Sequence, residues 1–364
     1  MSEDNNNNSD NESISSSASS YLPTKDYFSS YFDLNVHEVM LKDKPRTLAY
    51  KNAIERNQID FKDKVVMDIG AGTGILSMFA IRYGLASKVY AIEASPMANY
   101  CNQIIEKNGM SEKIKVINKK VEDVTSEDLD GLTSVDVIVS EWMGFYLLHE
   151  SMLESVLDAR DQWLNKKSGI LFPTHGDIIM APINVKSHLD EKVNYWDDVY
   201  GFDYSIFKPI ATESLPSPWI EHLESSAVTA NPVTLKYIDF TTIDKEELRS
   251  IVLKNIDFKF DHQLEPSKTT IIHGFSIWFN CYFIGSTNQT VQLSTAPGQP
   301  ATHWKQTNIL LPSELNITGF ENIQVNVSMI QDSENPRLYD ISIDFGDDDD
   351  EEEEEQQEEE NEQQ

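Results

Sequence analysis

The chain has 364 residues, of which 40% are hydrophobic and 10% aromatic, so it is long enough for two folded domains with real cores. Its formal net charge is −32, and the 13 acidic residues of the stretch 347–364 still leave −19 on residues 1–346. Such a field repels phosphate backbones and attracts cations. The composition therefore argues against direct nucleic-acid binding and favours a basic protein as the partner.

The two ends of the chain are polar and predict no packed structure. Residues 1–26 are rich in Asn and Ser, and residues 347–364 form an acidic tail, so both are expected to be disordered. Only two cysteines are present, and the start "MSEDNNNN" has neither a basic nor an apolar leader segment. These features indicate a protein of the cytoplasm and nucleus.

Structure is expected to begin at about residue 27 with two helices. The apolar residues of 27–41, "YFSSYFDLNVHEVML", recur at loosely helical spacing. Asp43 is placed as an N-cap, with Pro45 in the first turn of a second helix that runs to about Arg56.

Between residues 64 and 173 the pattern predicts βαβ units. Apolar runs of strand length alternate with helical stretches, which is typical of a parallel sheet. The runs are "KVVMDIG", "KVYAIEAS", "KIKVIN" and "VDVIVSE", followed by the helical stretch "ESMLESVLDARDQWL" and the strand "SGILFP". Residues 27–173 are therefore expected to form one α/β domain.

Residues 174–346 read as a second, all-β domain, because short strand-like runs follow one another closely between turn residues. The uncharged stretch 269–304 is interrupted by polar residues, so paired strands are preferred to a membrane span. An excursion at about 195–233, rich in aromatics and Pro, is expected to leave the β domain and pack on a partner.

A glycine-rich turn in "VVMDIGAGTGILSMFA" predicts a nucleoside-binding loop. Gly70, Gly72 and Gly74 let the backbone approach a ligand, and Asp68 stands at the strand end, where it can orient the loop. Glu93 follows the next strand and suits a ribose diol. The spacing GxGxG differs from the dinucleotide pattern GxGxxG, which argues against NAD as the ligand.

Two carboxylates, Glu141 and Glu150, stand nine residues apart among apolar neighbours. On one continuous helix they would face opposite sides, so they can converge only if the residues between them form a hairpin-like loop, with Gly144 placed to turn it. A converging pair would bind a cation such as a guanidinium. From the residues alone, helix capping, glycosidic chemistry and metal binding with His149 stay open as alternatives.

The segments "VMDIGAGTGILSMFA", "AIEAS", "SEWMGFYLLHESML", "ARDQWL" and "THWKQT" together resemble the type I protein arginine methyltransferases. These S-adenosylmethionine-dependent enzymes form asymmetric dimethylarginine. The resemblance runs from about residue 27 to 345. It implies an α/β Rossmann-like methyltransferase domain followed by an all-β barrel domain with a helical dimerisation arm. It also implies a homodimer, or a higher oligomer, and no metal.

The resemblance assigns roles to individual residues. It implies catalytic roles for Glu141, Glu150, His303 and Asp43, and cofactor contacts for His37, Arg46, Asp68, Gly70, Gly72, Gly74, Glu93, Val121, Glu122 and Met152. It places Tyr27, Phe28, Tyr31, Met40, Met152 and Trp304 near the substrate or the product-determining positions. Without it, Asp43 would pass as a helix cap, Arg46 as a surface residue and the methionines as core filler. Phe145 and His149 replace tyrosines that are common in the family, which bears on substrate preference.

The leading hypothesis is an enzyme that methylates arginines of basic proteins, such as histone tails and Arg/Gly-rich proteins. The alternative is a catalytically weak scaffold with a methyltransferase fold whose acidic surface binds basic partners. The intact glutamate pair and the complete glycine loop favour the enzyme.

Overall fold

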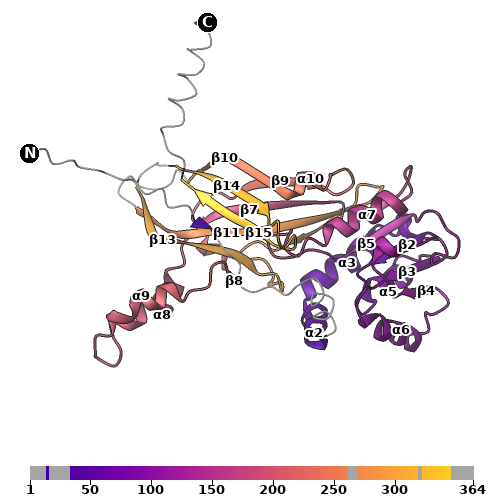
Figure 1. Cartoon of the computed structure of the whole chain (residues 1–364), viewed down its shortest axis with the longest axis horizontal. Helices are drawn as coiled ribbons and strands as arrows, with labels where there is room; N and C mark the ends of the chain where they lie inside the picture. Colours follow the sequence, from indigo (N-terminus) through magenta and orange to yellow (C-terminus); the bar gives the residue numbers. More distant parts are fainter. Residues whose placement is uncertain (1–13, 16–32, 261–268, 319–321, 346–364) are drawn as a thin grey trace, which may run out of the picture.

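The computed structural model describes residues 14–15, 33–260, 269–318 and 322–345. Within these ranges, an α/β domain and an antiparallel β domain lie end to end along the long axis, and a helical arm projects from the β domain (Figure 1). The predicted fold class is confirmed. The aromatic residues Tyr27, Phe28 and Tyr31, most of the 1–26 segment and the acidic tail 347–364 lie outside the described residues.

The α/β domain is built on five parallel strands in the order β4-β3-β2-β5-β6. The strands are β2 (Val65–Ile69), β3 (Lys88–Ile92), β4 (Ile114–Ile117), β5 (Val137–Ser140) and β6 (Ile170–Phe172). The connecting helices are α5 (Ile75–Arg82), α6 (Met97–Lys107), η1 (Val121–Asp123) and α7 (Leu153–Trp163). The topological switch point lies between β2 and β5, because β3 and β4 are added on one side of β2 and β5 and β6 on the other. Open α/β sheets bind ligands at the carboxyl ends of the strands at such a point.

Among the described residues, three helices precede the sheet: α2 (Leu34–Lys42), α3 (Lys44–Arg56) and α4 (Gln58–Phe61). The predicted cap is confirmed, because the Asp43 carboxylate accepts a hydrogen bond from the Arg46 backbone N–H at 3.0 Å, and Pro45 lies in the first turn of α3. The helix also ends at Arg56 as predicted. The cap fixes where α3 starts, and with it the position of the Arg46 side chain one turn later.

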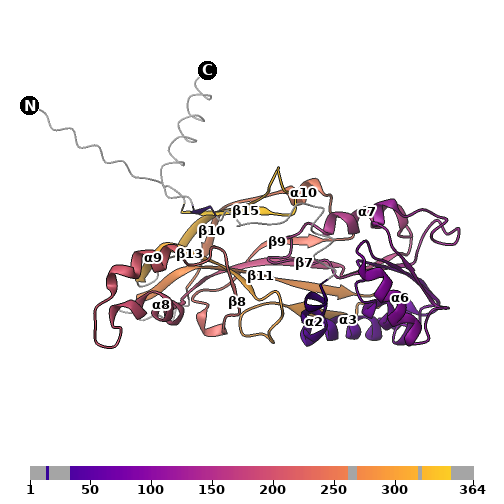
Figure 2. The same ribbon diagram turned by 60° about the horizontal axis from the view of Figure 1, so that its bottom comes forward.

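The β domain contains two antiparallel sheets around a common core (Figure 2). One has the order β8-β13-β11-β7-β9 with β12 also paired to β11, and the other has the order β1-β15-β14-β10. Rings of the two sheets meet in the core, where Phe258 and Phe275 lie 5.6 Å apart. The strands are β1 (Ile14–Ser15), β7 (His175–Ile183), β8 (Trp219–Glu221), β9 (Val233–Asp239), β10 (Ser250–Phe258), β11 (Thr269–Ile284), β12 (Thr290–Ser294), β13 (Gln306–Thr318), β14 (Ile323–Gln331) and β15 (Tyr339–Asp344), and the short helices are η4 (Ser225–Ala227) and α10 (Glu246–Arg249).

The uncharged stretch that invites a membrane interpretation is the centre of a sheet. It begins with β11, which pairs with β7, β12 and β13 and is buried along most of its length. In the part of the chain that the structure describes, no helix has the length and apolarity needed to cross a bilayer.

Strand β1 corrects one sequence prediction. Residues 1–26 are predicted to be disordered, yet Ile14 and Ser15 pair with Ile343 and Ser342 of β15. An edge strand exposes unpaired N–H and C=O groups that can recruit another segment of chain, and β15 would be such an edge without β1. A compositional prediction of disorder takes no account of a distant strand that offers pairing.

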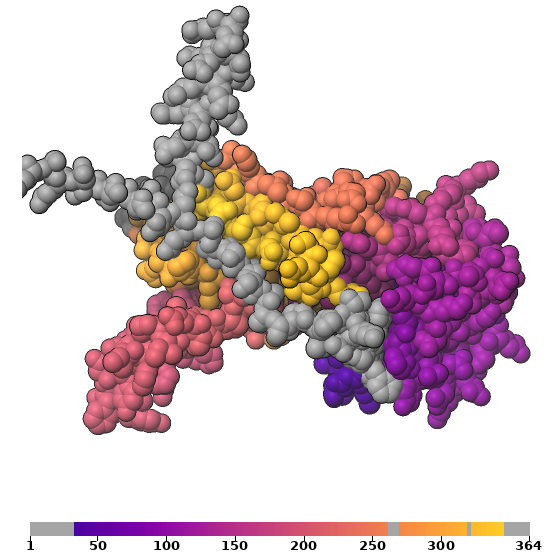
Figure 3. Space-filling model, in the orientation of Figure 1, coloured from indigo at the N-terminus to yellow at the C-terminus, as the bar shows by residue number. Residues whose placement is uncertain are grey.

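The projecting arm differs in its bounds from the predicted 195–233. It contains α8 (Lys186–Lys192), η2 (Asn194–Asp197), η3 (Ser205–Phe207) and α9 (Lys208–Glu213), so it starts earlier (Figure 1). It also ends earlier, because β8 returns to the sheet by pairing with β13. Figure 3 shows the arm standing away from the body of the molecule. Its exposed large apolar residues are Tyr195, Tyr200, Phe202, Tyr204, Ile206, Phe207 and Ile210.

Candidate active site

A cavity of about 690 Å³ lies at the carboxyl edge of the parallel sheet. Its walls come from α2, the glycine loop after β2, the end of β3, η1, the segment after β5 with the start of α7, and three loops of the β domain. Pockets of this size hold small-molecule ligands, and the cavity spans the junction of the two domains.

The glycine loop forms one wall of the cavity through Gly70 and Gly72. Both have positive φ, +68° and +53°, and a Cβ on Gly70 would lie 2.4 Å from the Met152 side chain. The Gly72 N–H donates to Glu93 Oε2 at 2.8 Å, while Glu93 Oε1 accepts from the Ser95 N–H at 2.8 Å. Glu93 is thereby fixed at the rim with acceptor capacity left on both oxygens.

Asp68 and Gly74 are predicted to contact a cofactor, but neither lines the cavity. Asp68 is buried beneath the loop, where its Oδ2 accepts from Ser77 Oγ at 2.6 Å. Burial raises the pKa of Asp68 to about 7, against the effect of the Ser77 hydrogen bonds. Gly74 packs against α6, because a Cβ there would lie 2.9 Å from Cys101 Sγ. Both residues support the loop from behind.

The other residues predicted to contact the cofactor surround the same cavity. His37, on α2, lies opposite the loop, because a Cβ on Gly72 would be 3.4 Å from its ring. Val121 and Glu122 reach the cavity from η1, and the Glu122 carboxylate accepts from Ser155 Oγ at 2.5 Å. Met152 lines it from the start of α7.

The segment between the two glutamates is a hairpin-like loop, as predicted. Gly144 and Leu147 exchange both backbone hydrogen bonds at 3.1 Å, so the chain turns back on itself. A Cβ on Gly144 would lie 2.1 Å from the His149 carbonyl oxygen, so only glycine permits this approach. Glu141 and Glu150 consequently line one cavity.

His149 is part of this loop and is neutral at pH 7. Its Nδ1 lies 3.1 Å from Tyr146 Oη, and burial lowers its pKa to about 4. The ring also faces Phe145 at 5.3 Å. Among the described residues, no group of three or more His, Cys, Asp or Glu side chains is arranged to hold a metal ion.

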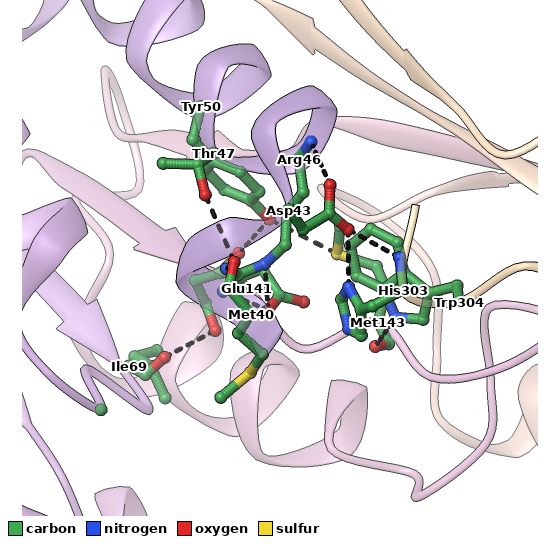
Figure 4. Close-up of polar contacts among 12 residues, drawn as sticks. Met40, Asp43, Arg46, Thr47, Tyr50, Ile69, Glu141, Met143, His303 and Trp304 are labelled. Carbon is green, nitrogen blue, oxygen red and sulfur yellow. Dashed lines mark hydrogen bonds and ion pairs between the residues drawn. The ribbon is translucent and has the colours of Figure 1, made fainter. Parts of the chain in front are cut away.

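Arg46 contacts the first glutamate directly (Figure 4). Its Nε and Nη2 lie 2.8 and 2.6 Å from Glu141 Oε2, and its Nη1 donates to the Met40 carbonyl oxygen at 2.7 Å. Each side chain of the pair is 9% exposed. Three of the five guanidinium N–H groups are therefore engaged, and two are left for a ligand carboxylate.

Asp43 and His303 join the two domains, so the predicted pair is present (Figure 4). Asp43 Oδ2 accepts from the His303 backbone N–H at 2.8 Å and lies 2.7 Å from His303 Nδ1, while Oδ1 caps α3. Burial raises the pKa of Asp43, but hydrogen bonds from His303 and Arg46 outweigh it, so the pKa is lowered. The Asp43 carboxylate therefore both caps α3 and pairs with His303.

Trp304 closes the site next to His303. Its indole N–H donates to the Met143 carbonyl oxygen at 2.7 Å, and the side chain is almost fully buried. Met40, which the resemblance assigns to a product-determining position, also lines the cavity.

The sequence did not single out two contributors to the site. Tyr50 is buried under the cavity and donates to the Ser140 carbonyl oxygen at 2.8 Å, which braces the end of β5. Pro336 and Arg337, from the loop between β14 and β15, form part of the cavity wall. Tyr50 reads as a core residue and the loop as an ordinary turn, so no local signal marked either of them.

Known proteins resemble the chain along nearly its whole length. Residues 174–350 match the model of the arginine methyltransferase oligomerization subdomain, and residues 31–148 match the TRM5/TYW2 methyltransferase domain. The chain is 39% identical to probable protein arginine N-methyltransferase 6.1 of Oryza sativa subsp. indica, over 92% of each chain. It is 38% identical to protein arginine N-methyltransferase 1 of Saccharomyces cerevisiae, over 88% of this chain and 87% of the yeast protein.

Solved structures give the same result. The Trypanosoma brucei PRMT1 enzyme–prozyme heterotetrameric complex with AdoHcy contains a chain with 34% identity and a TM-score of 0.73, covering 88% of this chain and 96% of that one. A crystal structure of PRMT6-SAH has 31% identity and a TM-score of 0.75, covering 86% and 100%. On this likeness in sequence, fold and length, the chain belongs to the protein arginine N-methyltransferase family.

Proposed function

We propose that the chain transfers methyl groups from S-adenosylmethionine to the guanidino nitrogens of arginine in proteins, giving monomethylarginine and asymmetric dimethylarginine. One observation carries the proposal. Glu141 and Glu150, at the two ends of a hairpin-like loop, line the cavity that the glycine loop and Glu93 also line. A cation-binding pair and a nucleoside-binding loop therefore share one chamber.

The residues present fit S-adenosylmethionine. Gly70 and Gly72 line the cavity with backbone alone, so a ligand can approach the loop closely, and Glu93 has acceptor capacity for a ribose diol. Two N–H groups of Arg46 suit the carboxylate of the methionine end. His37, Val121, Glu122 and Met152 complete the enclosure. When bound, this cofactor supplies a methyl group on a positively charged sulfur.

The glutamates orient the acceptor. Among the described residues, Glu141 Oε1 accepts no hydrogen bond, because Arg46 engages only Oε2, so Oε1 is available to a guanidinium N–H. Glu150 approaches from the other end of the loop. Two carboxylates can hold a planar guanidinium so that its remaining nitrogen faces the methyl group, which lowers the barrier by positioning and electrostatics.

Transfer of the methyl group would break its bond to sulfur, replace one N–H bond of the arginine by an N–C bond and release one proton. His303, held at its Nδ1 by Asp43, and the two glutamates are proton acceptors at the site. Trp304 and Met143 close the adjacent wall and limit water there.

The proposed substrates are basic protein segments such as histone tails and Arg/Gly-rich regions. The net charge of −32 supports this choice, because it favours encounters with cationic chains. Met40 and Met152, the two positions that resemble the methionines of enzymes forming asymmetric dimethylarginine, line the cavity and support the type I product. The presence of only two cysteines supports a location in the cytoplasm and nucleus, which a fluorescent fusion of the full chain would test.

We further propose a homodimer, or a higher oligomer, built through the arm. The arm exposes Phe202 by 68% and Ile206 by 80%, and it falls within the match to an oligomerization subdomain. The Trypanosoma brucei relative is a heterotetramer. Sedimentation of Ile206→Asp should shift the protein toward the monomer, whereas Val252→Asp, at an exposed apolar position on β10, should not. An unchanged dimer in Ile206→Asp would refute the arm as the interface.

The test of the activity is incubation of the full chain with methyl-labelled S-adenosylmethionine and an Arg/Gly-rich peptide, followed by mass spectrometry of the product. Asymmetric dimethylarginine is expected, and symmetric dimethylarginine would refute the type I assignment. Glu150→Gln should bind the cofactor normally and lose most turnover, because it removes charge with little change of volume. The matched control is Glu112→Gln, an exposed glutamate remote from the cavity. Cofactor binding without any transfer by the wild type would refute the enzyme.

A further inference from the structure

Glu150 and the next residue, Ser151, adopt an unusual backbone conformation. Their φ values are +72° and +52°, and neither residue is glycine. A non-glycine residue in the left-handed region costs on the order of 1–3 kcal/mol unless the surroundings hold it there, and such residues cluster at active sites. Something must therefore fix this short segment.

The β14–β15 loop, residues 332–338, supplies the contacts. The Glu150 N–H donates to the Arg337 carbonyl oxygen at 2.7 Å, and Arg337 Nη1 donates back to the Glu150 carbonyl oxygen at 2.9 Å. Ser151 Oγ donates to the Pro336 carbonyl oxygen at 2.5 Å. Both peptide groups that flank the Glu150 side chain are thus tied to a loop that is 187 residues away in sequence.

The β14–β15 loop is itself braced, so it can act as a rigid support. Asp332 Oδ1 accepts from the backbone N–H groups of Glu334 and Asn335 at 2.7 and 2.9 Å. At the end of β14, Gln331 Nε2 donates to the Pro336 carbonyl oxygen at 2.8 Å and reaches Glu154 Oε1 on α7 at 3.1 Å. The contacts form a closed network between the loop and the start of α7.

We propose that Arg337 is a positioning residue for methyl transfer: its guanidinium, acting through the Glu150 peptide, fixes the direction of the Glu150 carboxylate in the cavity. A rotation of that peptide would swing the carboxylate, and a misplacement of 1 Å in a reacting geometry costs about 100-fold in rate. The inference rests on the proposed role of Glu150. The β14–β15 loop would then contribute to methyl transfer as well as to the wall of the cavity.

The test compares Arg337→Ala and Arg337→Lys with the wild type in the full chain. Arg337→Ala keeps the carbonyl oxygen that accepts from Glu150, so one of the two reciprocal bonds survives and the loop retains its anchor. The expected result is a fall in kcat of about 10- to 100-fold with cofactor Kd within about twofold of the wild type. Arg337→Lys should recover part of the loss, since it restores one charged donor. Because the bond from the Glu150 N–H survives, Arg337→Ala should stay fully folded at the assay temperature, as thermal unfolding beside Glu334→Ala, an exposed neighbour in the same loop, would check.

The decisive readout is a double-mutant cycle. If Arg337 acts through Glu150, then Arg337→Ala should cause no further loss of kcat in the Glu150→Gln background. A similar loss in both backgrounds, a kcat equal to that of Glu334→Ala, or a loss that follows the unfolding midpoint would each overturn the inference. A Glu150→Gln enzyme with wild-type turnover would instead overturn the proposed function itself, and the inference with it.

Discussion

The ion pair between Arg46 and Glu141 allows a quantitative test of the site. Glu141→Gln keeps the shape of the side chain and removes its charge, while Arg46→Met removes the guanidinium and keeps much of the volume. In the wild type, two nitrogens of Arg46 contact one oxygen of Glu141 at 2.8 and 2.6 Å, and each side chain is 9% exposed. Either single change leaves a buried charge without its counterpart.

The expected magnitude follows from that burial. Removal of one partner of a buried pair costs about 3–5 kcal/mol, whereas replacement of both partners is often close to neutral. We take about 3 kcal/mol for each single variant, because the pair borders a cavity. Near the unfolding midpoint, 3 kcal/mol corresponds to a fall of roughly 6–12 °C for a domain of this size. The double variant should lose much less than the sum of the two.

The assay is thermal and chemical unfolding of the full chain, with cofactor binding measured in parallel. A control cycle on the exposed pair Lys186–Asp190 should show no measurable coupling, because water already screens those charges. If the losses of Arg46→Met and Glu141→Gln add within about 0.5 kcal/mol, the two residues do not act as a unit and the reasoning is refuted.

Three further predictions concern the loop and the junction. Gly144→Ala should lower stability and turnover together, since its Cβ would lie 2.1 Å from the His149 carbonyl oxygen; an unfolding midpoint equal to the wild type would contradict this. Because the unfolded imidazole takes a proton below about pH 6.5 and buried His149 only near pH 4, stability should fall as the pH drops through that window. His149→Gln should remove up to about 3 kcal/mol of that dependence, as measured by unfolding between pH 4 and 7. Asp43→Asn keeps an acceptor for the helix cap, whereas Asp43→Ala does not, and both variants lose the charge that faces His303. The Asp43→Ala protein should therefore be less stable than the Asp43→Asn protein by about 1 kcal/mol. Equal stabilities of the two variants would show that the cap is unimportant.

The sequence predicted the α/β domain well because its signals are local. Buried parallel strands give continuous apolar runs, as in β2 and β5, and the cap at Asp43 is set by residues within one turn. The hairpin between the two glutamates followed from helical geometry, which allows no other way for them to converge. These inferences needed no knowledge of distant contacts.

Long-range contacts escaped the same reasoning. Arg46 reaches Glu141 across 95 residues, and Arg337 reaches Glu150 across 187. The sequence around Arg337 resembles that of an ordinary turn. Its contact with Glu150 is therefore visible only in the three-dimensional arrangement of the two domains. Asp68 and Gly74 were correctly tied to the glycine loop, yet whether a loop residue faces the ligand or the support behind it depends on side-chain packing.

The β domain therefore contributes more to the site than a wall. His303 pairs with the cap of α3, Trp304 donates to the carbonyl oxygen of Met143, and Arg337 exchanges hydrogen bonds with Glu150. Each contact joins the β domain to a different segment of the cavity: the start of α3, the first turn of the hairpin-like loop and the second glutamate. Two of these contacts, at Met143 and Glu150, hold the hairpin-like loop near its two ends, and the third holds the start of α3. A loop held at both ends would lose little entropy in binding the proposed guanidinium. If Arg337 positions Glu150 as proposed, the alignment of the two glutamates depends on both domains: Arg46 of the α/β domain holds Glu141, and Arg337 of the β domain holds the peptide group of Glu150.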